Sequence, residues 1–455
     1  MTAKPVIAIF DVGKTNKKLF LFDEHYQIVY EKSARFIETV DEDGDACENL
    51  ASLKSSVFES LDEVFKRKEF DIKALNFSTY GASFVYLSED GEPVAPLYNY
   101  LKPYPDELLK QFYDTYGGED EFAKNAASPV LGSLNSGMQL YRIKYEKPEL
   151  FEKIKYALHL PQYMSYLITG KCFADITSIG CHTNLWDFKN EKYQDWVYQE
   201  GIIDKLPSLF PCNEVMRCEY NGHALDVGVG LHDSSAALIP YLANFHEPFA
   251  LISTGTWCIS LNPFNDQPLT AEELKQDCLC YLNYKEKPVK ASRLFAGFEH
   301  EQQAKRIADH FGKSSSGFKT IKYNASIIEQ LKARQSNAED IKFESRDLSL
   351  YTNEIEAYHQ LIIDLIKQQV ASTKLVIENT GVKRIFVDGG FGNNDIFMHL
   401  LANVFEEEEI FAASMAQATA VGTAIAIHKA WNTTALAGNI IELRFYPRSE
   451  GVHIN

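Results

Sequence analysis

Two stretches of the chain share one pattern of apolar and polar positions: an apolar run, a short polar turn and a second apolar run. The first covers residues 6–22, where the turn reads DVGKTNKK. The second covers residues 249–261, where the turn reads STGTW. Apolar runs of strand length on either side of turn residues predict a β-hairpin in each stretch. Taken alone, the first stretch is explained most simply as a hairpin with a solvated basic tip.

Each hairpin is followed later in the chain by an amphipathic helix and then by a strand with a glycine turn. Apolar residues at helical spacing predict a helix over residues 50–67, and ALNFSTYGASFVYL follows at 74–87. In the second half, helical spacing begins near residue 355 and Gly381 ends it, after which KRIFVDGGFGNN occupies 383–394. The repeated order predicts two domains of related design.

The length of the chain agrees with this division. A chain of 455 residues is too long for one ordinary hydrophobic core, so more than one domain is expected. We place the boundary between residues 240 and 248, which divides the chain into residues 1–244 and residues 245–455.

Charge and cysteine usage narrow the class of partner. The formal net charge of -18 makes nucleic acid an improbable partner, although a small anion could still bind a local group of donors. No apolar run is long enough to span a bilayer, and the chain begins directly with a strand, so no membrane partner and a cytoplasmic location are expected. The eight cysteines include no C-x-x-C pair and are expected to be reduced thiols.

Two motif-like stretches do not fit the sites that they suggest. The acidic run Asp41–Asp45 lacks the glycine and glutamate that a calcium-binding EF-hand loop needs, so we expect a solvated loop. Gly312-Lys313-Ser314 resembles the end of a phosphate-binding P-loop, but the required earlier glycine is Ile307 and a helix precedes the motif.

Three positions admit both a structural and a functional interpretation. Asp233, in GLHDSSAA, is either the cap of a helix that begins near Ser234 or a general base at the head of that helix. The small residues at 81–83 are either a packed turn or a backbone that a ligand can approach. His182 is more often a hydrogen-bonded structural residue than a catalyst.

Four motifs, taken together and in order, resemble those of the FGGY carbohydrate kinases. They are DVGKTN, GLHDSSAA, STGTW and VDGGFGNN, and they span nearly the whole chain. The first and third are most similar to those of the rhamnulose and fuculose kinases. The resemblance implies an α/β fold of two ribonuclease-H-like domains with a central cleft, in which sugar binds the first domain and ATP binds the second, with Mg²⁺ as the metal cofactor.

The resemblance also implies roles for individual residues. Asp11 would hold Mg²⁺, and Asp233 would be the catalytic base that accepts the proton of the attacking sugar hydroxyl. Two turns would hold the nucleotide phosphates: Gly13, Thr15, Asn16 and Lys17 in the first, and Gly255 and Thr256 in the second. Other nucleotide contacts would come from Gly297, Gly389, Gly390 and Asn393. The sugar would meet Gly81, Ala82, Ser83, Tyr98, His232 and Asp233.

Some positions depart from the family pattern and bear on the substrate. Where many members carry a motif like W-x-D-x-R, residues 98–102 read YNYLK, without the acid and with Lys102 in place of arginine. Gln162 and Gln417 replace the acids that the family usually carries at those positions. The expected reaction is phosphorylation of a ketose at a primary hydroxyl, with L-rhamnulose or L-fuculose favoured. Xylulose, ribulose or glycerol, and a non-catalytic ATP-switched protein, are the alternatives, and a homodimer is possible.

Overall fold

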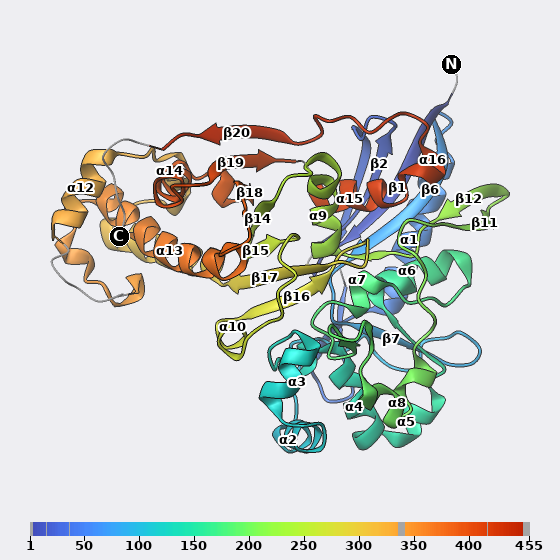
Figure 1. Ribbon diagram of the computed structural model, residues 1–455. Coiled ribbons are helices and arrows are strands. Elements are labelled where there is room, and N and C mark those ends of the chain that lie inside the picture. Colours follow the sequence, from blue (N-terminus) through green and yellow to red (C-terminus); the bar gives the residue numbers. More distant parts are fainter. Residues whose placement is uncertain (1–2, 15, 36, 335–341, 416, 449–455) are drawn as a thin grey trace.

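The computed structural model describes residues 3–14, 16–35, 37–334, 342–415 and 417–448. Within them, two mixed sheets form the centres of two lobes that lie side by side (Figure 1). Helices flank both sheets, so the predicted two-domain α/β architecture is confirmed.

The first sheet is built around the predicted hairpin at the start of the chain. Its strand order is β11-β12-β6-β1-β2-β3, and β13 also pairs with β6. β1 pairs antiparallel with β2 and parallel with β6. The strands are β1 (Lys4–Val12), β2 (Asn16–Asp23), β3 (Ile28–Arg35), β6 (Phe70–Thr79), β11 (Met216–Tyr220), β12 (His223–Val227) and β13 (Leu231–His232).

The second sheet repeats this core arrangement. Its order is β16-β17-β15-β14-β18-β19-β20, in which β14 pairs antiparallel with β15 and parallel with β18. The hairpin and the later parallel strand therefore occupy equivalent places in both lobes. The strands are β14 (Phe249–Thr254), β15 (Cys258–Asn262), β16 (Cys278–Leu282), β17 (Pro288–Leu294), β18 (Arg384–Gly389), β19 (Glu409–Ser414) and β20 (Glu442–Tyr446).

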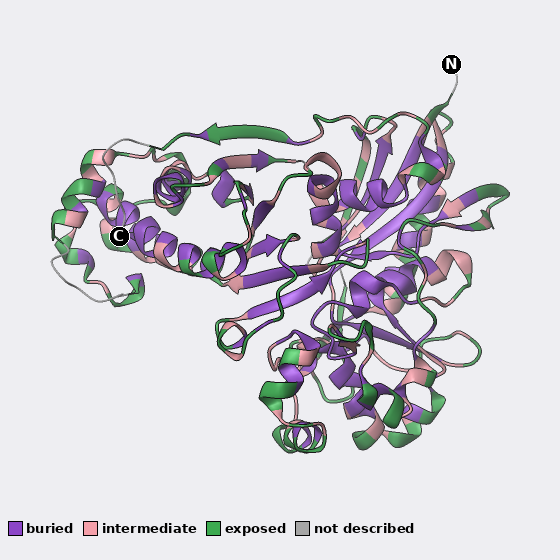
Figure 2. Cartoon of the chain, in the orientation of Figure 1, coloured by how far each residue is buried: buried purple, intermediate pink, exposed green. Residues whose placement is uncertain are grey.

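The helices cover the sheets and bury their apolar faces, as the purple ribbon at the centre of each lobe shows (Figure 2). They are α1 (Leu50–Phe65), α2 (Asp106–Thr115), α3 (Glu119–Ala126), α4 (Ser136–Glu146), α5 (Pro148–Lys153), α6 (Leu160–Thr169), α7 (Ile176–Ile179), α8 (Asp195–Gln199), α9 (Asp233–Asn244), α10 (Ala271–Lys275), α11 (Ala296–Phe311), α12 (Ala325–Arg334), α13 (Glu354–Ile377), α14 (Asp395–Val404), α15 (Ala418–Ala426) and α16 (His428–Trp431).

A separate hydrophobic cluster lies beside the first sheet. Phe112, Tyr141 and Trp196 are among its fully buried members, and they come from α2, α4 and α8. The short strands β7 (Phe84–Leu87) and β8 (Tyr156–His159) pair and connect this cluster to the first sheet. Short pairs also form between β4 (Glu38–Val40) and β5 (Ala46–Glu48), and between β9 (Trp186–Asp187) and β10 (Lys192–Tyr193).

Two helices cross at the centre of the molecule, where the lobes meet. α9 packs against α15, and a Cβ added to Gly422 of α15 would lie 1.9 Å from the carbonyl oxygen of Ala236 on α9. α15 also packs against β1 and β6, because its apolar side chains join the core of the first sheet. Residues 418–431 therefore return to the first lobe although they follow the second in sequence. The predicted division at residue 244 assigns these residues to the second domain, and it stays a prediction.

The acidic loop at Asp41–Asp45 differs from the solvated loop that we expected. The Lys102 ammonium lies 2.5 Å from Asp41, 2.7 Å from Asp43 and 3.0 Å from Asp45. The Asp41 side chain has no exposed surface. A lysine thus occupies the centre of the carboxylates, where a metal ion would have to bind, so the expectation of a solvated loop is wrong for Asp41.

In the described ranges, no helix is both long and apolar enough to cross a membrane.

Candidate active site

Two carboxylates, Asp11 and Asp233, meet where the first sheet faces the second lobe. Asp11 lies at the end of β1 and accepts a hydrogen bond from the Ser78 hydroxyl at 3.0 Å. Burial raises the pKa of Asp11 to about 6, and the negative charge of Asp233 adds to the rise. Two carboxylates that raise each other's cost of ionisation favour a proton, a cation or a proton-donating ligand between them.

Asp233 is held at the head of a rigid helix. It is the first residue of α9, and its Oδ1 accepts the Ser234 amide at 2.6 Å. The surrounding protein raises its pKa to about 6, yet 35% of its side-chain surface remains accessible. The carboxylate is thus enclosed but reachable by a ligand. The helix begins one residue earlier than predicted, with His232 as its N-cap.

Strand pairing explains how the two carboxylates come together. β13 pairs with β6 in parallel, so that His232 lies opposite Thr79 at the edge where β6 ends. The apolar run of β1 ends at the same edge, because Asp11 lies opposite Ser78. Chain segments more than 200 residues apart therefore bring Asp11 and Asp233 to one end of the sheet.

The tip of the first hairpin is held by its own turn and by a neighbouring loop. The Gly13 amide donates to the Asn16 carbonyl at 2.9 Å, so a phosphate would have to share or displace that bond. Lys14 is paired with the buried carboxylate of Glu48. The Lys14 ammonium also lies 5.2 Å from the ring centre of Tyr80. The predicted phosphate contact Thr15 lies outside the described residues.

Lys17, which we expected at the nucleotide, lies on the opposite face of the hairpin. It is buried, which lowers its pKa, and the charge of Glu59 on α1 acts in the opposite direction. Lys18 is the cross-strand partner of Asp11 and its charge acts to lower the pKa of Asp11. Because side chains alternate along a strand, Lys18 rather than Lys17 shares the face of the carboxylates.

The second hairpin turn is surrounded by glycines from other elements. A Cβ added to Gly297 would lie 1.8 Å from the Gly255 carbonyl oxygen, and one added to Gly389 would lie 2.0 Å from that of Thr254. The φ of Gly389 is +90°, a conformation that favours glycine. Asn393 reaches back to the Gly389 carbonyl at 3.4 Å. The structure therefore brings Gly255, Thr256, Gly297, Gly389, Gly390 and Asn393 together.

Four of the predicted sugar residues lie together around His232. A Cβ added to Gly81 would lie 2.6 Å from the His232 ring, so this glycine is a contact position. The Ala82 carbonyl accepts a bond from Gln139 at 2.7 Å. Close to His232, three of the buried polar atoms that have no hydrogen-bond partner in the described chain are Ser83 Oγ, Gln139 Oε1 and His232 Nδ1. Unpaired buried polar atoms are costly, and a polyhydroxyl ligand could satisfy them.

Tyr98, the remaining predicted sugar contact, is paired elsewhere. Its hydroxyl donates to Glu42 at 2.5 Å, and the Lys147 ammonium lies 5.2 Å from its ring centre. It lines a small pocket with Ser133 and Gln139. Tyr98 is thus linked to Ala82 through Gln139, whose amide donates to the Ala82 carbonyl.

Sequence reasoning missed Tyr100 and Glu48 near the site. Burial raises the pKa of Tyr100, and the carboxylates of Asp233 and Glu48 raise it further. Tyr100 lies inside the 98–102 segment, so its proximity could have been suspected. Nothing in the sequence separates the buried Glu48 from the acids at the surface.

Three aromatic rings beside Gly297 were also missed. Trp257 and Phe295 have ring centres 4.5 Å apart, and Phe295 stacks on Phe298 at 4.6 Å. All three are exposed, by 42%, 40% and 43% respectively. Exposed aromatic rings next to a glycine turn are a suitable surface for a planar base. The aromatic residues on either side of Gly297 were the available signal.

Comparison with known proteins agrees with this geometry. Residues 6–239 match the N-terminal domain of the FGGY family of carbohydrate kinases, and residues 246–435 match the C-terminal domain of carbohydrate kinase FGGY. A rhamnulokinase of Mannheimia succiniciproducens is 23% identical over 265 residues, which cover 56% of this chain and 52% of that protein. A rhamnulokinase of Halalkalibacterium halodurans is 24% identical over 268 residues, 54% and 52% of the two chains. The chain thus spans about half the length of these curated relatives.

Solved structures show the same fold. A carbohydrate kinase from Novosphingobium aromaticivorans has a TM-score of 0.80 at 19% identity and covers 97% of this chain and 96% of its own. A ligand-bound xylulose kinase from Lactobacillus acidophilus has a TM-score of 0.78 at 17% identity, with 98% and 94% covered. At such identities the likeness concerns the fold. With both domain models matched in order along the chain, this protein belongs to the FGGY family of carbohydrate kinases.

Proposed function

We propose that the protein is an ATP-dependent kinase that phosphorylates a ketose at a primary hydroxyl. The observation that carries the proposal is the enclosed but accessible carboxylate of Asp233, fixed at the head of α9 beside Asp11. Phosphoryl transfer requires mainly positioning and charge neutralisation, with one base for the attacking hydroxyl.

Asp233 acts as that base. Its raised pKa of about 6 leaves it ionised at neutral pH and more basic than an ordinary carboxylate. The helix head and the Ser234 amide fix its orientation, so the accessible oxygen faces the bound sugar. The unpaired atoms of Ser83 and His232 would bind other hydroxyls of the same sugar.

The donor set of Asp11 suits Mg²⁺. The ion prefers oxygen ligands and retains several waters, so a single carboxylate is sufficient protein contact. The mutual destabilisation of Asp11 and Asp233 gives the chain a reason to bind a cation here. When bound, Mg²⁺ neutralises charge on the phosphates of ATP.

The second lobe is proposed to hold the nucleotide. Glycines at 255, 297 and 389 allow backbone and ligand to approach closely, and Asn393 supplies an exposed amide. The exposed rings of Trp257, Phe295 and Phe298 extend this surface.

The substrate is proposed to be a 6-deoxyketohexose, L-rhamnulose or L-fuculose, which would yield the 1-phosphate. Two curated relatives are named rhamnulokinase, which supports this choice over xylulose, ribulose or glycerol. The cytoplasmic location and the homodimer stay predictions.

The test is ADP release in the presence of ATP and Mg²⁺, with each of L-rhamnulose, L-fuculose, xylulose, ribulose and glycerol. We expect sugar-dependent ADP in a one-to-one ratio with sugar phosphate, highest for one of the two deoxyketoses. ADP release that no sugar stimulates would reject the kinase and favour an ATP-switched protein. Highest activity on another ketose or on glycerol would reject only the substrate.

A further inference from the structure

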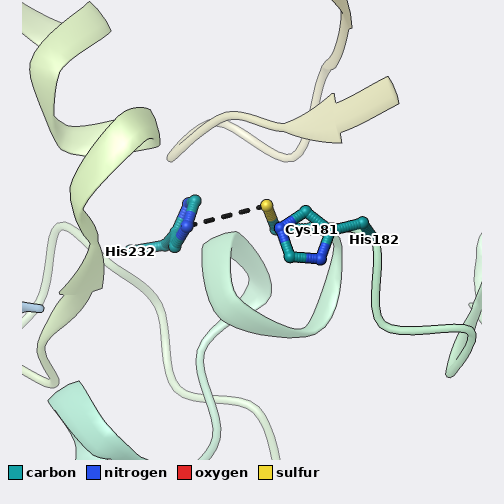
Figure 3. A group of neighbouring side chains, drawn as sticks. All are labelled: Cys181, His182 and His232. Atoms are coloured by element: carbon teal, nitrogen blue, oxygen red, sulfur yellow. Dashed lines mark hydrogen bonds between the residues drawn. The ribbon is translucent and has the colours of Figure 1, made fainter. Parts of the chain in front are cut away.

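Cys181, His182 and His232 form a compact cluster whose ring nitrogens and sulfur converge. One ligand-type atom from each lies within 4.8 Å of the others, and all three residues are buried. The Cys181 sulfur is 3.7 Å from Nε2 of His232. Figure 3 shows the thiol between the two imidazole rings, with one nitrogen of His182 directed toward the sulfur.

The distances suit a tetrahedral metal ion. Zinc binds cysteine sulfur at about 2.3 Å and histidine nitrogen at about 2.0–2.1 Å, which places neighbouring ligand atoms roughly 3.5 Å apart. The measured separation of sulfur and nitrogen is close to this value. The other separations lie within 4.8 Å, so rotation of the imidazole side chains would complete the site.

The two ring positions are fixed by contacts outside the cluster. Nδ1 of His182 lies 3.1 Å from the Leu134 carbonyl, so it donates there and leaves Nε2 with a lone pair directed inward. Gly81 lies against the His232 ring and holds its position. His182 also has a φ of +41°, an uncommon conformation for a residue with a side chain.

Cys181 is held by the other lobe. It forms a β-bridge with Tyr281, and the Leu282 amide donates to the Gly180 carbonyl at 3.0 Å. The thiol is thus fixed at a point where the lobes touch. A metal ion bound by Cys181 would therefore lie at the junction between the two lobes.

Asp233 offers an oxygen as the fourth ligand atom, and the charges nearby suit a divalent ion. Oδ1 of Asp233 lies 3.4 Å from Nε2 of His232. A thiolate and one carboxylate would balance the charge of a divalent ion. The guanidinium of Arg293 is a nearby positive charge that would repel a metal cation. It is paired with Asp277 at 2.6 Å, which offsets that charge. A sulfur, two imidazoles and a carboxylate select zinc over magnesium, because magnesium prefers oxygen ligands.

We propose that Cys181, His182 and His232 form a Zn²⁺ site that recruits Asp233 and thereby inhibits the enzyme. Binding displaces the thiol proton to solvent, and the carboxylate of Asp233 becomes the fourth ligand. The inhibitory part rests on the proposed role of Asp233 as base, whereas the binding part does not. Sugar and Zn²⁺ would compete, since both require the carboxylate of Asp233.

Binding is tested with Co²⁺ as a spectroscopic substitute, in the full chain without sugar. We expect one Co²⁺ per chain, a thiolate-to-cobalt charge-transfer band, and loss of the band when Zn²⁺ is added. Cys181→Ser should abolish the band, and His182→Gln should weaken Co²⁺ affinity about 10- to 100-fold. Cys278→Ser, at a buried cysteine of β16, is the matched control and should keep the band.

Two results would overturn the site: no charge-transfer band in the wild-type chain, or an unchanged band in Cys181→Ser. If Cys181→Ser does not fold, Cys181→Ala and the His182→Gln affinity decide instead. In the kinase assay, micromolar Zn²⁺ should inhibit the wild type reversibly and should inhibit Cys181→Ser at least 10-fold less. If no sugar is phosphorylated, the cobalt spectra still decide the site. If phosphorylation occurs and the band is absent, only this inference fails.

Discussion

The two hairpin turns show how one local pattern is supported in different ways. The turn between β1 and β2 is supported by charge, because Lys14 pairs with Glu48. The turn at residues 254–258 is supported by close backbone packing against Gly297 and Gly389.

The difference follows from the neighbours of each turn. At the first turn, among the described residues, an added Cβ on Gly13 would meet only the Asn16 carbonyl, at 3.5 Å, which is ordinary contact. At the second, the hydroxyl of Thr254 donates to the Asp388 carbonyl at 2.6 Å and accepts the Phe391 amide at 3.0 Å. The first lobe therefore supplies charged side chains, and the second supplies a fixed backbone.

The largest effect is expected at the charge of the first lobe. Asp233→Asn keeps the shape but removes the base, so kcat should fall about 10²- to 10⁴-fold. The KM for ATP should change little, because the nucleotide is assigned to the other lobe. Steady-state kinetics measure both, with Asp195→Asn as a solvent-exposed control. A normal kcat in Asp233→Asn would reduce Asp233 to a structural residue of α9.

The packed turn is tested by adding one methyl group. Gly297→Ala places a Cβ 1.8 Å from the Gly255 carbonyl, so we expect a loss of about 1–3 kcal/mol in the free energy of unfolding and weaker ATP binding. Gly13→Ala is the matched control in the other turn and should cost less than about 0.5 kcal/mol. Thermal unfolding and nucleotide titration provide the measurements. Equal losses in the two variants would erase the contrast between the turns.

The charge support of the first turn is tested at Lys14. Lys14→Met leaves the Glu48 carboxylate buried without its partner, at a cost of about 1–3 kcal/mol in stability. The double variant Lys14→Met with Glu48→Gln should recover part of that loss. Urea unfolding of the single and double variants gives the coupling. If the two losses simply add, the pair does not support the turn.

The smallest effect concerns the loop Asp41–Asp45, which precedes β5, and it depends on pH. Burial acts to raise the pKa of Asp41, but Lys102 and two backbone amides outweigh it and hold that pKa below the usual value. The pair therefore stabilises the fold above about pH 4 and loses that effect as pH falls through the lowered pKa. Lys102→Met should cost about 1–2 kcal/mol at pH 7.

The direction of the pH dependence tests the role of the Asp41–Lys102 pair. The difference in unfolding free energy between Lys102→Met and the wild type should shrink below pH 4. Lys110→Met, which breaks an exposed pair with Asp114, is the control and should cost less than about 0.5 kcal/mol at any pH. A constant difference from pH 7 to pH 3 would contradict the role of Asp41.

The sequence determined the elements and their order. Apolar runs of strand length predicted both hairpins, and helical spacing predicted α1 and α13, because these patterns depend on local periodicity. A glycine-rich turn marked the segment at 389, since close approach of backbones excludes side chains, whereas Gly297 was expected only from the family resemblance. The ordered motifs were enough to identify the family, which the domain models confirmed.

Only the tertiary structure decided which charges meet. Lys17 and Lys18 are adjacent in sequence, and the pleat of β2 directs one to α1 and the other to the face of Asp11. Glu48 pairs with Lys14, and Lys102 pairs with Asp41. Neither pairing is encoded by a local sequence pattern. The return of α15 to the first sheet is equally nonlocal. Periodicity specifies the face of an element, whereas contacts between distant side chains depend on how the elements pack.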